Sequence, residues 1–304
     1  MTENADSRRV LLVDAFTDEP LTGNAAGVVP DADGLAESQM QAVAAELGAS
    51  ETAFLRPSEA ADRRIRYFTP AREVDLCGHA TIAAHAFLFA EGVVEAGTHT
   101  LETNVGVLDV ELTEDGVVWM TQDDPTVETV DVDYDRVGDA LGVDAAALRD
   151  VGADLPAAVA STGLPFLVVP VNFLERLGGA TPDMNAVAEL AEEHDAAGIY
   201  AFTFDAVDAD STLHARMFAP GYGVPEDPVT GTASGACGAY LRSVDAFEGE
   251  LPDEMRFEQG HFVDRPGVVR VRVGDDVRVG GEAVAALDGS LSVPPADDDD
   301  IVEA

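Results

Sequence analysis

The chain has 304 residues, 46% of them hydrophobic, so it is long enough to bury one large core or two ordinary ones. It carries 58 acidic residues against 17 basic ones, all of them Arg, and its formal net charge is −41. This charge repels nucleic-acid phosphates and anionic lipids, so we expect no nucleic-acid and no membrane partner. Because the acidic residues are spread along the whole chain, we interpret them as an adaptation to a halophilic, high-salt cytoplasm.

Cysteine usage and segment hydropathy both favour a soluble cytoplasmic protein. Cys77 and Cys237 are too few for a disulfide framework or a cysteine zinc site. The opening residues, MTENADSRRV, lack the apolar core of a signal peptide. No stretch reaches the length of roughly 18 apolar residues that a membrane helix needs. Residues 294–304 are acidic, and we expect them to form a disordered tail.

The first part of the chain alternates strand and helix patterns. Apolar residues recur at helical spacing over 35–47, where Gly48 provides a stop, and residues 79–90 form a second helix that is apolar on nearly all sides. A helix of that kind is usually buried within a core. Strand-like segments are predicted at 10–13, 50–55, 64–68, 107–113 and 117–122.

A second series of elements begins near residue 125. Helices are predicted over 137–149, 182–194 and 232–242, and strands over 164–171, 198–204, 212–218, 267–274 and 276–280. The last of these helices, TASGACGAYLR, is uncharged until Arg242. Together the two series predict a two-domain α+β protein.

The two apolar helices resemble each other. Residues 78–88 read GHATIAAHAFL and residues 231–241 read GTASGACGAYL, with five of eleven positions identical. Each follows a Phe-x-Pro sequence, at 68–70 and 218–220. The shared order of strand, Phe-x-Pro, loop, Gly and helix favours an internal duplication. The first-turn amides of each helix would attract an anion, so we expect a small carboxylate substrate at the two helix starts.

Other kinds of site find little support in the sequence. Asp227 and Thr230 could simply cap a helix, and Glu51 could lie on the solvated face of a strand. A two-thiol racemase would need a Cys directly before the glycine that begins each of these helices. Cys77 precedes Gly78, but Thr230 precedes Gly231. Cys237 lies inside the helix, where a small buried residue is expected. No pair of the six histidines has metal-ligand spacing, so we expect no metal site.

Several motifs together resemble the PhzF family of phenazine-biosynthesis-like isomerases. These are VDAF at 13–16, PLTGN at 20–24, SETAF at 50–54, LCGHAT at 76–81 and EDPVTGTA at 226–233. Gln259-Gly260 and Arg265-Pro266-Gly267 fit its later portion, whereas Ala25 replaces a common Pro. The family resembles diaminopimelate epimerase in fold, which implies two pseudo-equivalent domains, each a sheet wrapped around a central helix, with the active site between the halves. By analogy, the N-terminal half is residues 1–122 plus about 282–293, and the C-terminal half is 123–281.

The resemblance also implies roles for individual residues. Glu51 matches the catalytic acid/base, and His79 and Asp227 match its catalytic neighbours. Proton abstraction from carbon needs a strong base, which burial of a carboxylate supplies. The predicted substrate-binding residues are Asn24, Gly78, Gly231 and Thr232. We expect a cofactor-free isomerase that forms a homodimer. The alternatives are a non-catalytic small-molecule-binding protein using the same cleft and a thiol-dependent racemase or epimerase.

Overall fold

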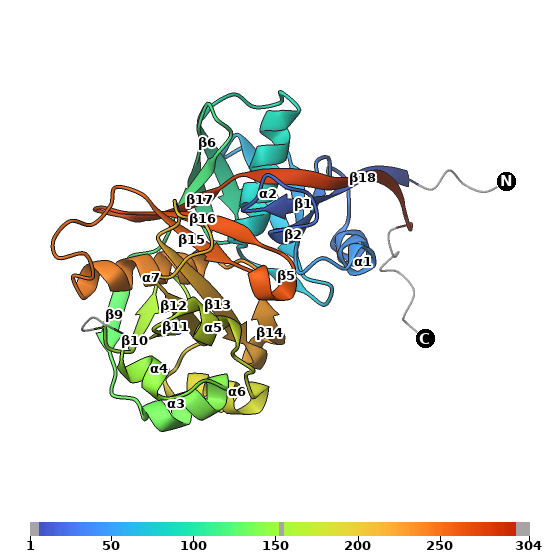
Figure 1. The fold of residues 1–304 in the computed structure, drawn as a ribbon. Helices are drawn as coiled ribbons and strands as arrows, with labels where there is room; N and C mark the ends of the chain where they lie inside the picture. The colour runs from blue at the N-terminus through green and yellow to red at the C-terminus, as the bar shows by residue number, and fades with distance from the viewer. Residues whose placement is uncertain (1–5, 152–154, 296–304) are drawn as a thin grey trace, which may run out of the picture. The chain divides into compact units, whose positions relative to one another are not determined.

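The computed structural model describes residues 6–151 and 155–295, and it divides into two compact units (Figure 1). Unit 1 comprises Met1–Leu21, Ala25–Val118 and Glu282–Ala304, and unit 2 comprises Thr22–Asn24 and Trp119–Gly281. Three residues near the start of the chain therefore belong to unit 2. The expected acidic tail at 294–304 lies outside the described residues except for its first two prolines.

Unit 1 is a curved sheet with one helix at its centre. Its elements are β1 (Asp6–Ala15), β2 (Asn24–Val29), α1 (Glu37–Leu47), β3 (Thr52–Arg56), β4 (Arg63–Phe68), β5 (Glu73–Val74), α2 (Gly78–Ala90), β6 (Gly97–Thr103), β7 (Gly106–Leu112) and β18 (Ala283–Val293). The long antiparallel pair of β1 and β18 joins the two ends of the unit, and β2 runs parallel to β3. This pairing brings residues from opposite ends of the chain into one sheet.

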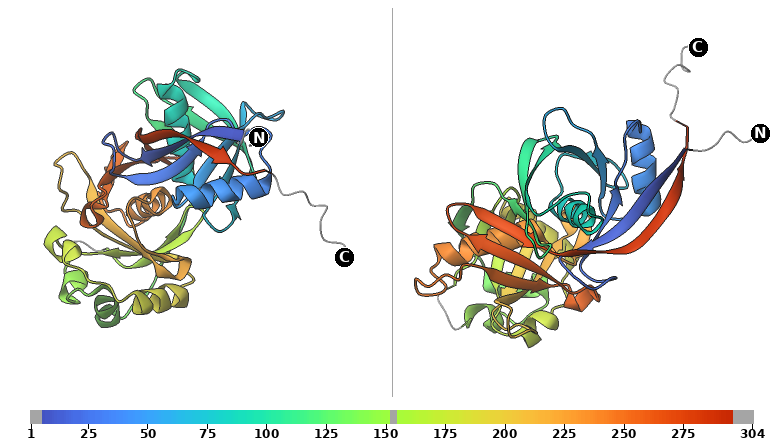
Figure 2. Two further views of the ribbon diagram at one scale, coloured as in Figure 1. Left: turned by 90° about the vertical axis from the view of Figure 1, so that its right-hand side faces the viewer. Right: turned by 90° about the horizontal axis from the view of Figure 1, so that it is seen from above.

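The central helix α2 is buried as its apolar sequence predicts. Nine of its residues are buried, and it packs against β1, β3 and β18. Figure 2, in its right-hand view, shows α2 end-on with strands of its own unit around it. The shorter α1 buries Met40, Val43 and Ala44 in a separate cluster with Phe54 and Phe68.

Unit 2 repeats this plan with more helices. Its elements are β8 (Val118–Thr121), β9 (Thr126–Thr129), α3 (Tyr134–Leu141), α4 (Ala146–Arg149), β10 (Ala158–Ser161), β11 (Pro165–Pro170), α5 (Leu174–Gly178), α6 (Met184–Glu193), β12 (Gly198–Thr203), β13 (Leu213–Ala219), η1 (Pro220–Tyr222), β14 (Val224–Asp227), α7 (Gly231–Ser243), β15 (Met255–Gln259), η2 (His261–Val263), β16 (Gly267–Val273) and β17 (Val277–Gly281). Helix α7 packs against β9, β10, β11, β16 and β17, and α3–α6 contribute to a second core cluster with β11 and β12.

The two central helices differ in how closely their sheets approach. At the positions of Ile82 and His85 in α2, α7 has Gly235 and Gly238. A Cβ on Gly238 would lie 2.7 Å from Val271 Cγ1, and one on Gly235 would lie 3.0 Å from Val279 Cγ1. The glycines therefore let the valines of β16 and β17 pack directly on the helix backbone.

One predicted element is wrong, and several were missed. The single helix predicted over 137–149 is two helices, because Gly142 ends α3 in a left-handed conformation and the chain then restarts at Ala146. The strands β2, β6, β9, β10 and β15 and the five-residue helix α5 are not predicted, because each is short or lacks a clear pattern in the sequence. None of the helices in the described residues is long and apolar enough to cross a membrane.

Candidate active site

In unit 1, the predicted catalytic residues Glu51 and His79 are in contact. Glu51 immediately precedes β3, and its backbone carbonyl accepts a hydrogen bond of 2.9 Å from the Gly27 amide of the parallel strand β2. His79 is the second residue of α2. His79 Nε2 lies 3.4 Å from Glu51 Oε2, and Ser50 Oγ lies 3.3 Å from the same nitrogen. The parallel pairing and the helix start thus bring a carboxylate and an imidazole together.

The thiol of Cys77 extends this cluster on its other side. Cys77 Sγ lies 3.5 Å from His79 Nδ1, while the residue as a whole is 9% exposed, in keeping with a packed loop residue. The side chains of His79 and Glu51 are 14% and 24% exposed. A small molecule can therefore reach the carboxylate and the imidazole more easily than the sulfur.

Buried hydroxyl groups fix the start of α2. Thr81 Oγ1 donates to the Cys77 carbonyl at 2.7 Å and lies 2.5 Å from the Tyr67 hydroxyl. Burial raises the pKa of Tyr67, so this hydroxyl stays protonated. No side chain caps the first turn of α2, and a Cβ placed on Gly78 would meet no described atom within 4 Å. The start of α2 therefore has open space beside Gly78.

In unit 2, the predicted residues Asp227 and Asn24 are also in contact. Asn24 Nδ2 donates to Asp227 Oδ1 at 3.0 Å and to the Val229 carbonyl at 2.8 Å. Thr230 Oγ1 donates to the other carboxylate oxygen, Asp227 Oδ2, at 2.5 Å. The segment Thr22–Asn24 is held in place by Arg265, which donates to the carbonyls of Thr22 and Gly23 at 2.6 and 2.9 Å.

Gln259, at the end of β15, completes this second cluster. Its Nε2 donates to the Asp227 carbonyl at 2.7 Å, and its Oε1 accepts from the Thr230 amide at 3.2 Å. The sequence predicts no role for Gln259, which is part of a motif only. The sequence signal that could have located Gln259 is the glycine that follows it. Gly260 adopts a left-handed conformation with φ 87° and so marks a turn at the end of β15. Gln259 makes Asp227 and the start of α7 one hydrogen-bonded unit.

The simple capping interpretation of Asp227 and Thr230 does not match the observed geometry. Thr230 is the N-cap residue of α7, but its hydroxyl is directed to Asp227 and makes no side-chain capping bond. Gly231 and Thr232 form the first turn and are partly exposed, and the Thr232 carbonyl accepts from Thr162 Oγ1 at 3.1 Å. Cys237 is fully buried, as expected for a small core residue, and burial raises the pKa of its thiol.

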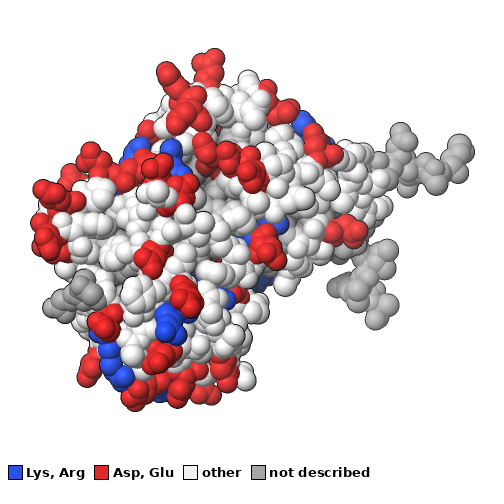
Figure 3. Space-filling view, in the orientation of Figure 1, with Lys and Arg blue, Asp and Glu red and all other residues white. Residues whose placement is uncertain are grey.

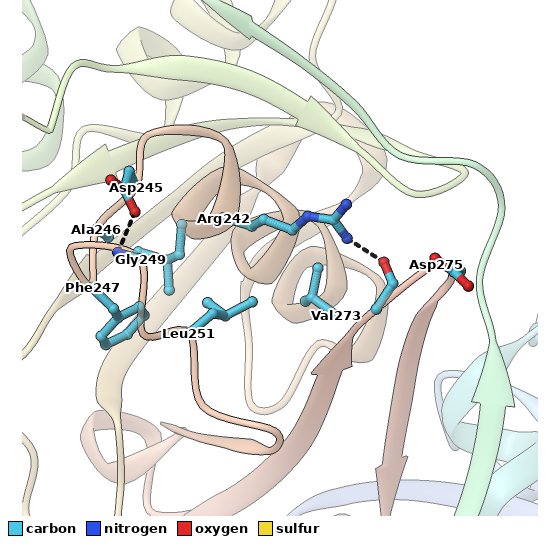
Figure 4. Close-up of a pocket in the computed structure, with 10 residues that line it drawn as sticks. Arg242, Asp245, Ala246, Phe247, Gly249, Leu251, Val273 and Asp275 are labelled. Carbon is cyan, nitrogen blue, oxygen red and sulfur yellow. Dashed lines mark hydrogen bonds between the residues drawn. The ribbon is translucent and has the colours of Figure 1, made fainter.

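A large hollow elsewhere in unit 2 contains none of the predicted site residues. It has a volume of about 590 Å³ and lies between the end of α7, the following loop and the β16–β17 turn (Figure 4). Asp245 Oδ1 accepts from the Gly249 amide at 2.6 Å, and Arg242 donates to the Gly274 carbonyl (Figure 4). The first bond stabilises the loop and the second joins α7 to the β16–β17 turn. The size of a hollow therefore does not by itself identify the active site.

Comparisons with known proteins identify the family. Residues 13–289 match the PhzC-PhzF family model, described as phenazine biosynthesis-like protein. The chain is 38% identical to the uncharacterized isomerase YfhB of Bacillus subtilis over 286 residues, covering 92% of this chain and 94% of the relative. It is 32% identical to the trans-2,3-dihydro-3-hydroxyanthranilate isomerase of Pseudomonas aeruginosa over 289 residues, covering 93% and 95% of the two chains.

Solved structures support the same assignment. The crystal structure of a PhzF-family phenazine biosynthesis protein from Bacillus anthracis is similar, with a TM-score of 0.85 and 34% identity, covering 94% of this chain and 99% of that one. A hydroxyproline epimerase from Agrobacterium vitis shares the fold at 15% identity, with a TM-score of 0.56 and coverage of 94% and 91%. The predicted α+β, epimerase-like fold is confirmed. The chain belongs to the PhzF family of phenazine-biosynthesis-like proteins and is an isomerase.

Proposed function

We propose that this isomerase moves a proton between two carbons of a small carboxylate substrate without a cofactor, and that Glu51 is the acid/base. The observation that carries the proposal is the Glu51 carboxylate, which is partly exposed and lies 3.4 Å from His79 Nε2. Glu51 would take a proton from a carbon, the electron pair would shift along the conjugated system, and Glu51 would return the proton to a different carbon. Atoms and charge balance over these two proton transfers without an external reactant.

The remaining predicted residues have supporting roles in this proposal. His79, whose Nε2 lies 3.4 Å from Glu51 Oε2, orients Glu51 or stabilises the charge that develops on the substrate. Gly78 at the start of α2, and Gly231 and Thr232 at the start of α7, are the substrate-binding residues of this proposal, since helix starts offer N–H donors and a positive partial charge. Asp227, held by Asn24 and Thr230, positions the start of α7 and the substrate. The isomerase from Pseudomonas aeruginosa is named for an anthranilate, which is itself a carboxylate.

Deuterium uptake tests the proposal directly. The chain is incubated in heavy water with trans-2,3-dihydro-3-hydroxyanthranilate and a panel of small unsaturated carboxylates, and the products are examined by mass spectrometry. Glu51→Gln should lower isomerisation and deuterium incorporation by about 100- to 10,000-fold, the usual contribution of a general acid/base. Glu46→Gln, on the exposed side of α1, is the matched control and should behave as the unmodified chain. Full activity in Glu51→Gln would exclude Glu51 from this role.

The same experiment separates the alternatives. A thiol-dependent racemase is the second candidate, because Cys77 Sγ lies 3.5 Å from His79 Nδ1. We expect Cys77→Ala to retain deuterium incorporation, whereas a thiol mechanism predicts its loss. A non-catalytic binding protein would bind a carboxylate of the panel and exchange no deuterium in any variant.

We further propose a cytoplasmic, salt-adapted homodimer. Acidic side chains are scattered over the face shown in Figure 3, in keeping with a net charge of −41 and the absence of Lys from the sequence. Concentrated salt screens repulsion between such charges within a few ångströms. Light scattering coupled to gel filtration at high salt should give twice the chain mass, and a mass of 31.8 kDa would exclude the dimer.

A further inference from the structure

We propose that unit 2 contains a binding site for a divalent transition-metal ion, formed by His214 and His261 with Glu258 orienting His214. The three residues come from β13, η2 and β15. One potential ligand atom from each lies within 4.8 Å of the others. This site is separate from the residues of the proposed reaction, so it does not depend on the proposed function.

The pairing of β13 with β15 creates the centre of the site. The two strands run parallel, and His214 is directly opposite Glu258 in their register. His214 Nδ1 lies 2.9 Å from Glu258 Oε2, and both side chains are almost fully buried, at 0% and 2% exposure. A histidine whose Nδ1–H is held by a carboxylate presents the lone pair of Nε2, which is the arrangement that commonly orients a metal-binding imidazole.

Two imidazole nitrogens at this point lack hydrogen-bond partners. Among the described residues, nothing pairs with His214 Nε2 or with His261 Nδ1, although both atoms are buried. The two rings are adjacent, with centroids 4.8 Å apart, and Phe262 covers His214 at 5.3 Å. An unpaired buried polar atom is costly, and binding of an ion by both nitrogens would remove that cost.

The chemistry of the donors selects the kind of ion. Imidazole nitrogens suit Zn²⁺, Co²⁺, Ni²⁺ and Cu²⁺, whereas Mg²⁺ and Ca²⁺ prefer oxygen ligands. Ligand atoms of a tetrahedral zinc site lie about 3.4 Å apart, and the candidate ligand atoms of these three residues lie within 4.8 Å of one another, so a small movement of the rings would bring them to that spacing. The half-buried His261, in the short turn η2, can make this adjustment.

A bound ion would stabilise the strand end that supports Asp227. Glu258 and Gln259 are consecutive in β15, so their side chains point to opposite faces of the sheet. Glu258 faces the histidines, and Gln259 bonds to Asp227 and Thr230. We therefore assign the ion a structural role.

Cobalt binding tests the site on the full chain. The chelator-treated protein is titrated with Co²⁺ in about 1 M salt, which screens nonspecific attraction to the acidic surface. The His79→Gln background is used, because Glu51, Cys77 and His79 form a second group that could bind an ion. We expect one saturable equivalent, with the visible absorption of nitrogen-coordinated cobalt, and a higher Tm with Zn²⁺ than with chelator.

Matched variants decide the result. His261→Gln, at the accessible edge, should abolish the cobalt absorption while leaving the far-ultraviolet circular dichroism unchanged, and Glu258→Gln should weaken binding by about 10- to 100-fold. His194→Gln, at the end of α6, is the control and should bind normally. No saturable binding in the parent, or equal binding in His261→Gln, would overturn the proposal.

Discussion

The buried carboxylate of Glu258 offers a sharp test of how unit 2 is stabilised. Its Oε2 accepts from the Val207 amide at 2.8 Å, and its Oε1 accepts from the Asp208 amide at 2.7 Å. His214 adds a third bond, to Oε2. Glu258→Gln keeps the size of the side chain but replaces one acceptor oxygen with an NH₂ group. That group must face a backbone N–H whichever way the amide is turned, so at least one hydrogen bond is lost.

The magnitude follows from the shift in protonation. Burial alone would raise the pKa of Glu258, but the hydrogen bonds from His214, Val207 and Asp208 outweigh it and lower the pKa to about 2, from an ordinary 4.5. A shift of this size corresponds to about 3 kcal/mol of the free energy of unfolding at pH 7. Because the pKa is lowered in the folded state, this contribution is present above about pH 4.5 and is lost as the pH falls towards 2.

Denaturant unfolding at pH 7, in high salt with chelator present, measures the loss. Glu258→Gln should reduce the free energy of unfolding by about 3 kcal/mol. Glu254→Gln is the matched control, because Glu254 pairs with Arg272 at 2.8 Å but remains 26% exposed, and it should cost less than about 1 kcal/mol. Equal losses in the two variants would refute the argument from burial and backbone hydrogen bonds.

Three further predictions concern other parts of the chain. Gly260→Ala should lower the free energy of unfolding by about 3 kcal/mol, because the φ of Gly260 is 87° and a Cβ would collide with the Arg265 carbonyl oxygen and lie 2.7 Å from the Pro228 carbonyl oxygen. Gly249→Ala, at φ 86° in open space, should cost about 1 kcal/mol in the same unfolding assay, and equal costs in the two variants would contradict the steric argument. Burial lowers the pKa of His85 from 6.5 to about 4, so the stability of the folded chain should fall as the pH drops from 6.5 to 4, because only the unfolded chain takes up a proton there. In thermal melts over this pH range, His85→Leu should lose less stability than the unmodified chain, and identical pH profiles would contradict this role of His85. Raising KCl from about 0.1 M to about 1 M should raise the Tm of the intact chain, and a constant or falling Tm would contradict the salt interpretation of the charge.

The local pattern of the sequence was sufficient for the long, strongly apolar elements. The helices at Gly78–Ala90 and Gly231–Ser243 were predicted to within a residue or two, because their uncharged alanine- and glycine-rich sequences suit complete burial. The similarity of the two helices, on which the predicted duplication rests, is likewise visible in the sequence alone. Short strands such as β2 and β10 were not predicted, since pairing with distant segments stabilises them more than their own alternation does.

The contacts of the functional residues were decided by the tertiary structure. The motifs singled out Glu51, His79, Asp227 and Asn24, but no spacing in the sequence indicates that Asn24 bonds to Asp227. The same limit explains why no histidine pair with metal-ligand spacing was found. His214 and His261 are far apart in sequence and become neighbours because β13 and β15 pair in parallel and η2 turns back over them. Burial and hydrophobic periodicity are local properties that a sequence records, whereas the proximity of polar side chains depends on strand register, which only the folded chain fixes.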